Sequence, residues 1–199
     1  MPGTNVELSE NELKLVTNSE FILTKNRIIE KVYTMFGSLS EVYKIELDKY
    51  AAILTYEIFS TTPKIYKGEN YLSLPYVMMD HPRVFFKEDV FAIRSFFWWG
   101  NYFSLTLQLS GKFLQVFKNN IGKNLKKHIE AGYFICTNDS QWEHHFEETN
   151  YRPLYAMDSI EEILNKPFIK IAKQHKLSQW NSAATFFERN YAEMIRLVI

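Results

Sequence analysis

The sequence predicts an α+β fold in which N-terminal and C-terminal helices pack on an antiparallel, meander-type β-sheet. Residues 102–109 alternate between apolar and polar side chains, which is the pattern of a strand with one buried and one exposed face. Gly100-Asn101 before this segment and Ser110-Gly111 after it are typical of tight turns, because Gly and Asn accept a positive φ. Apolar residues at three- and four-residue steps on either side of the segment predict the helices.

The composition indicates a single domain, residues 1–199, that is large enough to form a core without a disulfide or a metal. The 23 basic and 23 acidic residues cancel, which argues against a general binder of nucleic acid or anionic membranes. Cys136 is the only cysteine and the sequence shows no secretory leader, so a reducing cytoplasm is the expected location. No apolar window is long enough to predict a membrane-spanning helix.

Three helices are expected in the N-terminal third of the chain. A capping-box spacing at Ser9 predicts the start of a short helix. Residues 19–36 predict a second helix that stops at Gly37, and residues 38–60 predict a third that ends before Pro63. Two long amphipathic helices joined by a short loop are expected to pack as an antiparallel pair.

The pattern changes to that of strands after Lys64. Residues 71–79 predict a strand, and Pro75 favours a sheet edge because proline donates no backbone hydrogen bond. Residues 80–83 predict a loop. Residues 90–117 predict three consecutive strands, which form the meander.

The third of these strands has an alternative interpretation. Apolar residues recur at every fourth position through residues 113–129, which favours one helix starting at Lys112. Gly122 and the two asparagines before it favour a strand to Phe117 followed by a helix to Ala131. We therefore expect a strand to Phe117 and then a helix.

The C-terminal part predicts one more strand and several helices. The strand is expected at residues 133–137, and helices are expected over residues 139–148, from residue 159 with a restart at Pro167, and from Ser178 onwards. The last helix carries an apolar stripe that packs either in the core of the chain itself or in the interface of a homodimer.

The turn at Gly100-Asn101 sets the expected register of the central hairpin. With two turn residues, Trp98 pairs with Phe103 and Arg94 pairs with Leu107 on the apolar face. Arg94 then points towards the core, where a guanidinium needs a carboxylate or backbone carbonyls because burying it unpaired is costly. A structural ion pair is the ordinary interpretation, and an anion-binding arginine at the floor of a pocket is the functional one.

The opposite face of the hairpin carries aromatic rings, among them Trp99 and Tyr102, beside polar side chains. We interpret this face either as a platform for a ring-shaped ligand or as a surface that helices cover. Asp80, His81 and Arg83 place an acid, an imidazole and a guanidinium in one predicted loop. Asp80 and His81 are expected to point in opposite directions, since neighbours in an extended segment alternate.

Three other patterns are weaker signals. His144 has the helical spacing to Glu147 or Glu148 that two metal ligands need, but a metal site requires three or four ligands. The lysines and histidine of residues 118–128 favour a solvated helix face over a site for phosphate or RNA. Cys136 lies in an apolar context and is expected to be a buried, inert thiol. No metal or cofactor is predicted.

These observations predict a non-catalytic protein that binds a partner protein or a small molecule through an aromatic sheet face and a semi-buried arginine. The expected binding residues are Arg94, Trp99, Tyr102, Asp80, His81 and Arg83. The alternative is an enzyme in which His81 or His144 performs acid–base or metal chemistry on an anionic substrate held by Arg94. Single-stranded nucleic acid is a third possibility, and it requires exposed rings beside the lysine cluster.

Overall fold

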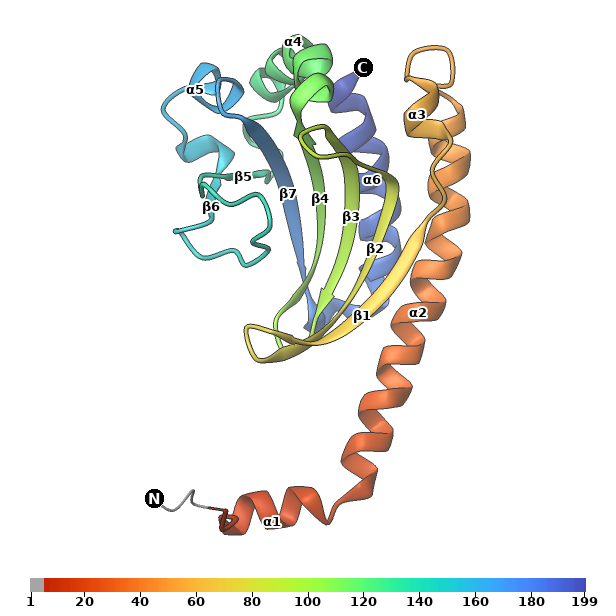
Figure 1. Ribbon diagram of the computed structural model, residues 1–199, viewed down its shortest axis with the longest axis vertical. Helices are drawn as coiled ribbons and strands as arrows, with labels where there is room; N and C mark the ends of the chain where they lie inside the picture. The colour runs from red at the N-terminus through yellow and green to blue at the C-terminus, as the bar shows by residue number, and fades with distance from the viewer. Residues whose placement is uncertain (1–5) are drawn as a thin grey trace.

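The computed structural model describes residues 6–199 and confirms the α+β class. Seven antiparallel strands form one sheet in the order β1-β2-β3-β4-β7-β5-β6 (Figure 1). In chain order, the strands are β1 (Lys64–Tyr71), β2 (Leu74–Phe85), β3 (Val90–Trp98), β4 (Tyr102–Ser110), β5 (Phe134–Cys136), β6 (Tyr151–Pro153) and β7 (Phe168–Lys176). The helices are α1 (Glu10–Val16), α2 (Ser19–Asp48), α3 (Tyr56–Phe59), α4 (Gly111–Lys127), α5 (Ile160–Leu164) and α6 (Ala183–Val198).

The predicted pair of N-terminal helices is wrong, because α2 runs without a break through Gly37. Val32, Phe36, Tyr43 and Leu47 are all buried, and they stay in phase on one side of the helix across the glycine. A glycine inside a helix costs about 1 kcal/mol relative to alanine, which is less than the burial of one large apolar side chain contributes. The continuous apolar stripe therefore decides the length of the helix.

Helices α2, α4 and α6 cover one face of the sheet, and the apolar core lies between them and the strands (Figure 1). Tyr43 of α2 stacks on Tyr191 of α6 with ring centroids 3.7 Å apart, and its hydroxyl lies 3.0 Å from the Ser95 hydroxyl of β3. Phe187, also from α6, packs edge-on against Phe36. The apolar stripe of α6 thus lies in the core of the chain itself, while dimerisation through this helix stays a prediction.

The central hairpin β3–β4 is present, but its predicted register is wrong by one residue. Three residues form the turn instead of two, so Trp98 pairs with Tyr102 and Arg94 pairs with Thr106. Gly100 adopts φ 73°, and the amide of Asn101 donates to the carbonyl of Trp98. The shift turns Arg94 away from the helices, onto the face that carries the polar residues of β4.

The third strand of the predicted meander is also wrong, because α4 begins directly after β4. Gly111 takes φ 53° at the start of this helix, and the Asp89 carboxylate accepts a hydrogen bond from the amide of Lys112 at 2.7 Å. Phe113, Phe117 and the apolar residues at the following turns are buried against the sheet. The repeat at every fourth position outweighed Gly122, and the alternative interpretation is the one that the structure shows.

Three further segments differ from the prediction. Residues 80–83 continue β2 with a bulge, and β2 lies inside the sheet while β1 forms the edge. Residues 139–148 form no helix and belong to an irregular segment, residues 137–150, between β5 and β6. The chain after Pro167 forms the strand β7 instead of a helix. This strand pairs with β4 on one side and with β5 on the other.

Several predictions of local structure are confirmed. Ser9 and Glu12 form the capping box of α1, and Ser159 caps α5. Strand β5 lies where the sequence places it, whereas the C-terminal helix α6 begins at Ala183, after a 3₁₀ helix over Leu177–Ser182, and not at Ser178. No helix in the part of the chain that the structure describes has the length and apolar character needed to cross a membrane.

Candidate functional site

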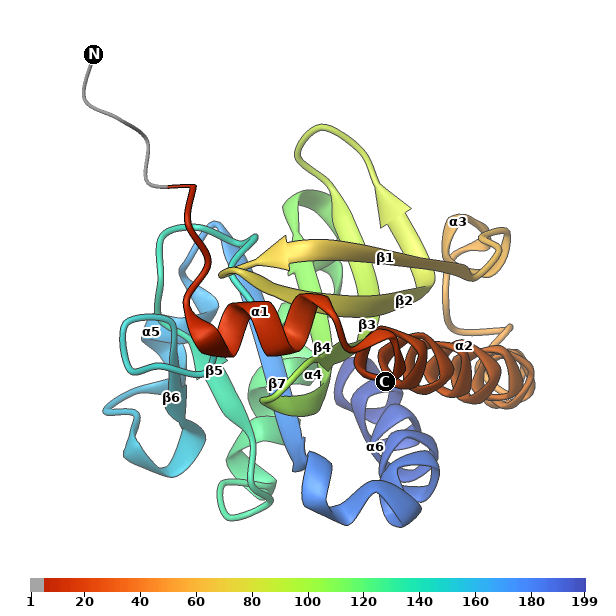
Figure 2. The same cartoon turned by 90° about the horizontal axis from the view of Figure 1, so that it is seen from below.

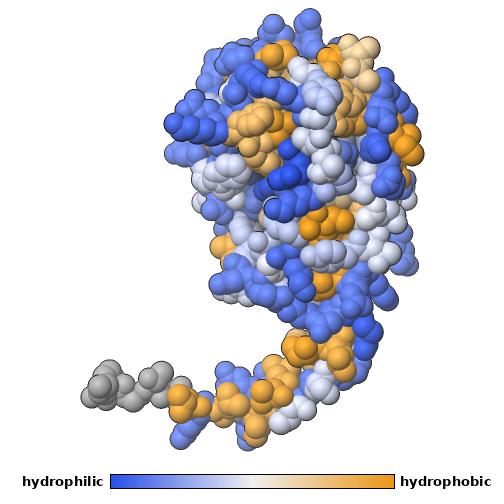
Figure 3. All heavy atoms as spheres, turned by 45° about the vertical axis from the view of Figure 1, so that its right-hand side comes forward, coloured by the Kyte–Doolittle hydropathy of each residue, from blue (hydrophilic) through white to orange (hydrophobic). Residues whose placement is uncertain are grey.

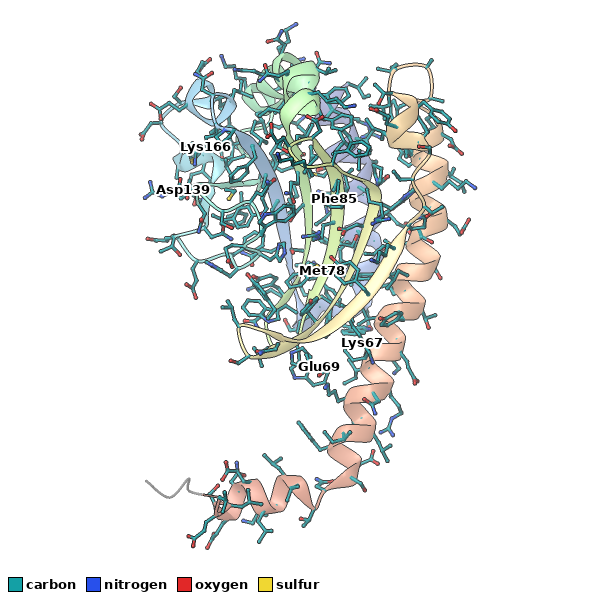
Figure 4. The ribbon with its side chains drawn as sticks, in the orientation of Figure 1. Lys67, Glu69, Met78, Phe85, Asp139 and Lys166 are labelled. Atoms are coloured by element: carbon teal, nitrogen blue, oxygen red, sulfur yellow. The ribbon has the colours of Figure 1, made fainter. Side chains whose placement is uncertain are left out.

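The second face of the sheet, the side that α2, α4 and α6 do not cover, carries buried polar side chains on neighbouring strands. Asp80 of β2, Arg94 of β3 and Thr106 of β4 lie in one row across the sheet. Lys170 of β7 lies in the next row, opposite Gln108. Residues 137–150, which we call the covering segment, lie at the β5–β6 end of the sheet and reach over this face with their side chains (Figure 1). Met78 and Phe85 mark the face on β2 in Figure 4. A buried row that contains charged side chains is unusual, because charged groups are rarely buried unless they are paired.

Asp80 is the carboxylate that the sequence predicts for Arg94. The guanidinium donates from Nε to Oδ1 at 2.7 Å and from Nη2 to Oδ2 at 2.9 Å, which is a bidentate pair. Both side chains are less than a tenth exposed. Burial opposes the charge of Arg94, but Asp80 holds the pKa of the guanidinium above its ordinary value. The pair is therefore ionic in the folded protein.

His144 contributes the third member of this cluster from the covering segment. Its Nε2 atom lies 3.1 Å from Nη1 of Arg94. Because an arginine can only donate, Nε2 must accept, and the imidazole is neutral with its proton on Nδ1. Burial lowers the pKa of His144 well below its usual range, and the charge of Arg94 lowers it further. The three side chains form a fixed chain from carboxylate to guanidinium to imidazole.

Two tyrosine hydroxyls fasten the covering segment to the sheet. Tyr71 accepts the backbone amides of His144 at 2.7 Å and His145 at 3.0 Å, and it donates to Glu143 at 3.2 Å. Tyr102 donates to the carbonyl of His144 at 3.3 Å. These bonds explain how a segment without regular structure holds His144 against Arg94.

An open depression of about 510 Å³ lies beside this cluster, and we call it the Arg94 depression. Its lining residues come from β1, β2, β3 and the covering segment, and they are Lys64, Tyr66, Tyr76, Met78, Asp80, Arg83, Phe85, Arg94, Trp142 and His144. Three cationic side chains face a single carboxylate, so the depression is electropositive. Nε of Arg83 is buried without a hydrogen-bond partner among residues 6–199, although a buried donor is ordinarily paired.

The structure places the predicted site residues in three locations. Asp80, Arg83 and Arg94 come together at the depression. Tyr102 lies on the same face but under the covering segment, in edge contact with Phe146. Trp99 lies on the helix side, where it packs edge-on against Phe97.

His81 points to the helix side of β2, opposite to Asp80 as expected, and does not reach the depression. Both of its ring nitrogens are buried without a hydrogen-bond partner in the described part of the chain. Burial lowers the pKa of His81 to about 4, and the nearby Asp48 and Lys44 act in opposite directions. The imidazole is therefore neutral at physiological pH.

Lys170 is the buried charged group of this face that the sequence did not predict as a site residue, whereas His144 was expected beside Arg94 only in the enzyme alternative. Lys170 is fully buried, donates to the carbonyl of Glu143 and lies 5.3 Å from the ring centroid of Tyr151. Burial lowers its pKa to about 8. A strand signal at residues 168–176 would have placed Lys170 beside Gln108, but the segment was interpreted as a helix.

The other predicted chemistries receive little support from the geometry. Burial raises the pKa of Cys136, whose thiol donates to Asn150 at 3.4 Å, as expected for an inert thiol. Within residues 6–199, no three His, Cys, Asp or Glu side chains are grouped closely enough to hold a metal. On α4, Lys126 pairs with Glu161 at 2.5 Å. This helix lies at the opposite end of the sheet from the turn that carries Trp99 (Figure 1).

No family model, curated protein or solved structure matches this chain. The interpretation of the site therefore rests on its own geometry.

Proposed function

We propose that the protein is a non-catalytic binding protein whose Arg94 depression takes a small anionic molecule with a planar ring. The observation that carries this proposal is the combination of three cations, four aromatic rings and one unpaired buried arginine donor at a single open depression. Cations fit a carboxylate or phosphate, and aromatic walls fit a flat ring. A depression built only for packing needs neither.

The residues of the depression have different roles in this proposal. Arg83 and Lys64 contact the anionic group, since neither has an ion pair among the described residues. Arg94 gives three of its five N–H groups to Asp80 and His144, so it acts as a fixed positive floor. Tyr66 and Trp142 flank the ring. Burial raises the pKa of Tyr66 to about 12, so its hydroxyl stays neutral.

The test is isothermal titration calorimetry with inorganic phosphate, benzoate and adenosine monophosphate. We expect a ring-bearing anion to bind more tightly than phosphate alone. Arg83→Gln should weaken that binding by roughly tenfold or more, because a charged hydrogen bond is lost. Lys67→Gln is the matched control, because Lys67 is an exposed lysine of the same strand as Lys64 but lies outside the depression. Absence of binding by all three probes, or equal effects of the two substitutions, contradicts the proposal.

An acid–base enzyme is the second candidate, and the meeting of Asp80, Arg94 and His144 in one place favours it. A neutral imidazole beside an anion site can in principle accept a proton. The low pKa of His144 and the engagement of its Nε2 by Arg94 make it a weak base at neutral pH. An enzyme of this kind predicts that His144→Gln abolishes turnover of a bound ligand while its affinity persists. If the protein only binds the ligand, neither the wild type nor His144→Gln turns it over.

A further inference from the structure

The N-terminal arm, residues 6–23, projects from the body of the protein and contacts it only near its base (Figures 1 and 2). Every residue of the arm is exposed, and the first buried residue of α2 is Ile29. Residues 19–28 of α2 therefore extend about 15 Å without a buried side chain, at about 1.5 Å per residue. An ion pair between Lys25 and Glu69 fixes the base of the arm to β1.

The arm is rich in apolar side chains that nothing in the described chain covers. Eight of the 18 exposed large apolar residues of residues 6–199 lie in it, namely Val6, Leu8, Leu13, Leu15, Val16, Phe21, Ile22 and Leu23. They form much of the orange surface of the projecting part in Figure 3. Monomeric proteins rarely expose a contiguous apolar patch above a few hundred Å². The arm thus has the composition of an interface.

The local structure of the arm also requires a partner. Helix α1 has seven residues and none of them is buried, although its capping box is complete. Isolated helices shorter than about 12–15 residues are marginal in water, so α1 needs packing to persist. Phe21 and Ile22 lie seven residues before Ile28 and Ile29, two helical turns away, so they continue the stripe that packs on the body. The packing face of α2 therefore extends beyond the body that it packs on.

We propose that a second copy of the same chain covers the arm, in a two-fold dimer in which the two α2 helices run antiparallel. This arrangement brings each arm to the far end of the partner's α2. The exposed apolar residues Val42, Ile45, Ile53 and Tyr56 lie at that end. A single two-fold axis then buries the arm of each copy against the far end of α2 in the other copy, as in an isologous interface.

The exposed area fits this assignment. Eight large side chains that are about half exposed present on the order of 800 Å² of apolar surface, and a standard interface buries about 800 Å² per partner. The arm carries four glutamates and one lysine, which disfavours an anionic membrane as the covering surface. This dimer does not involve the Arg94 depression and is independent of its function.

The experiment is sedimentation velocity of the full chain from low micromolar concentration upwards. We expect the wild type to be a dimer and the variant Leu13→Glu/Val16→Glu to be a monomer. Lys14→Glu is the control, because it changes the net charge by the same amount on the same helix, and we expect it to remain a dimer. ¹⁵N NMR spectra in which the resonances of the sheet are unchanged show that each variant is folded.

Four results contradict the proposal. A wild type that is monomeric at every concentration contradicts the dimer. The same holds if the monomer instead binds phosphatidylcholine vesicles in a flotation assay. A dimer that persists in Leu13→Glu/Val16→Glu shows that the arm does not form the interface. Dissociation of Lys14→Glu to the same extent shows that charge, and not apolar contact, controls association. As a second site, Ile45→Glu should dissociate the dimer as Leu13→Glu/Val16→Glu does, and a dimer that survives it contradicts the antiparallel arrangement.

Discussion

The two faces of the central strands differ in the charged side chains that they bury and in the elements that cover them. On the helix side, Ile93, Phe97 and Leu105 pack under three amphipathic helices. On the second face, Arg94 and Lys170 are also buried, beside an apolar cluster of Met78, Phe96 and Trp98, and the segment that contacts them has no regular structure. The helix side shows what stabilises the fold. The second face holds charges that stability alone does not require, because apolar residues often replace a buried ion pair at no cost in stability.

The largest expected effect concerns the helix side. Phe187 is fully buried and lies in ring contact with Phe36 and Phe103, at centroid distances of 5.4 and 5.7 Å. Phe187→Ala should lower the free energy of unfolding by about 4 kcal/mol, through lost burial and a cavity. Chemical denaturation measures this change. Ligand affinity at the Arg94 depression should be unchanged, and a parallel loss of affinity would show that the two faces are not independent.

The second effect separates stability from charge on the second face. Asp80→Asn should cost about 3 kcal/mol of unfolding free energy, because it leaves Arg94 buried without its anion. The double substitution Asp80→Leu/Arg94→Met should return to within about 1 kcal/mol of the wild type, because neither charge is then buried. Urea titrations of both variants give the comparison. If the double variant is as unstable as Asp80→Asn, the ion pair is needed for the fold itself.

A third effect follows from the burial of Lys170. Its pKa falls from 10.5 to about 8 on folding, so between these values the unfolded chain binds more protons and stability rises with pH. Below pH 8 the lysine is charged in both states, and its burial destabilises the fold by a constant amount. Lys170→Met should therefore be more stable than the wild type by roughly 3 kcal/mol at pH 7, since the fall of the pKa from 10.5 to about 8 corresponds to about 1.4 kcal/mol per unit.

The pH dependence of that difference distinguishes burial of the charge from ordinary packing. Denaturation of both chains at several pH values should show the advantage of Lys170→Met shrinking between pH 8 and 10.5. A constant difference across this range means that Lys170 is not a desolvated ammonium in the folded protein.

The smallest effect concerns the cover of the second face. Tyr71→Phe removes the hydroxyl that accepts the amides of His144 and His145, and it should cost about 1 kcal/mol. Hydrogen exchange should become faster at these two amides while the exchange at β3 and β4 stays as in the wild type. Unchanged exchange at His144 shows that another contact holds the segment.

The sequence alone is sufficient to predict the class of the fold and to predict that Arg94 needs an anionic partner. Alternation in β4 and the helical stripe of α6 depend on neighbouring residues, so local patterns reveal them. The stripe of α4 is equally local, but Gly122 and the asparagines before it led to the prediction of a strand at its start. Local patterns do not reveal the register, because Trp99 joined the turn where a strand position was expected. That one-residue shift moved Arg94 from the predicted apolar face to the second face.

The partners of Arg94 could not be read from local patterns either. Asp80 reaches it through the pairing of β2 with β3, which a bulge after Asp80 shifts. His144 reaches it from a segment 50 residues away that has no periodic pattern. Such contacts depend on tertiary structure, whereas the spacing of residues along the chain reports only local structure.

The most direct test of the account is an NMR titration of the ¹⁵N-labelled chain with adenosine monophosphate, which supplies both a planar ring and an anion. We expect saturable shifts at the side-chain N–H groups of Arg83, Arg94 and Trp142, and their loss in Arg83→Gln. No saturable shift at these groups, or shifts confined to the lysines of α4, would contradict the claim that the second face of the sheet is a binding site.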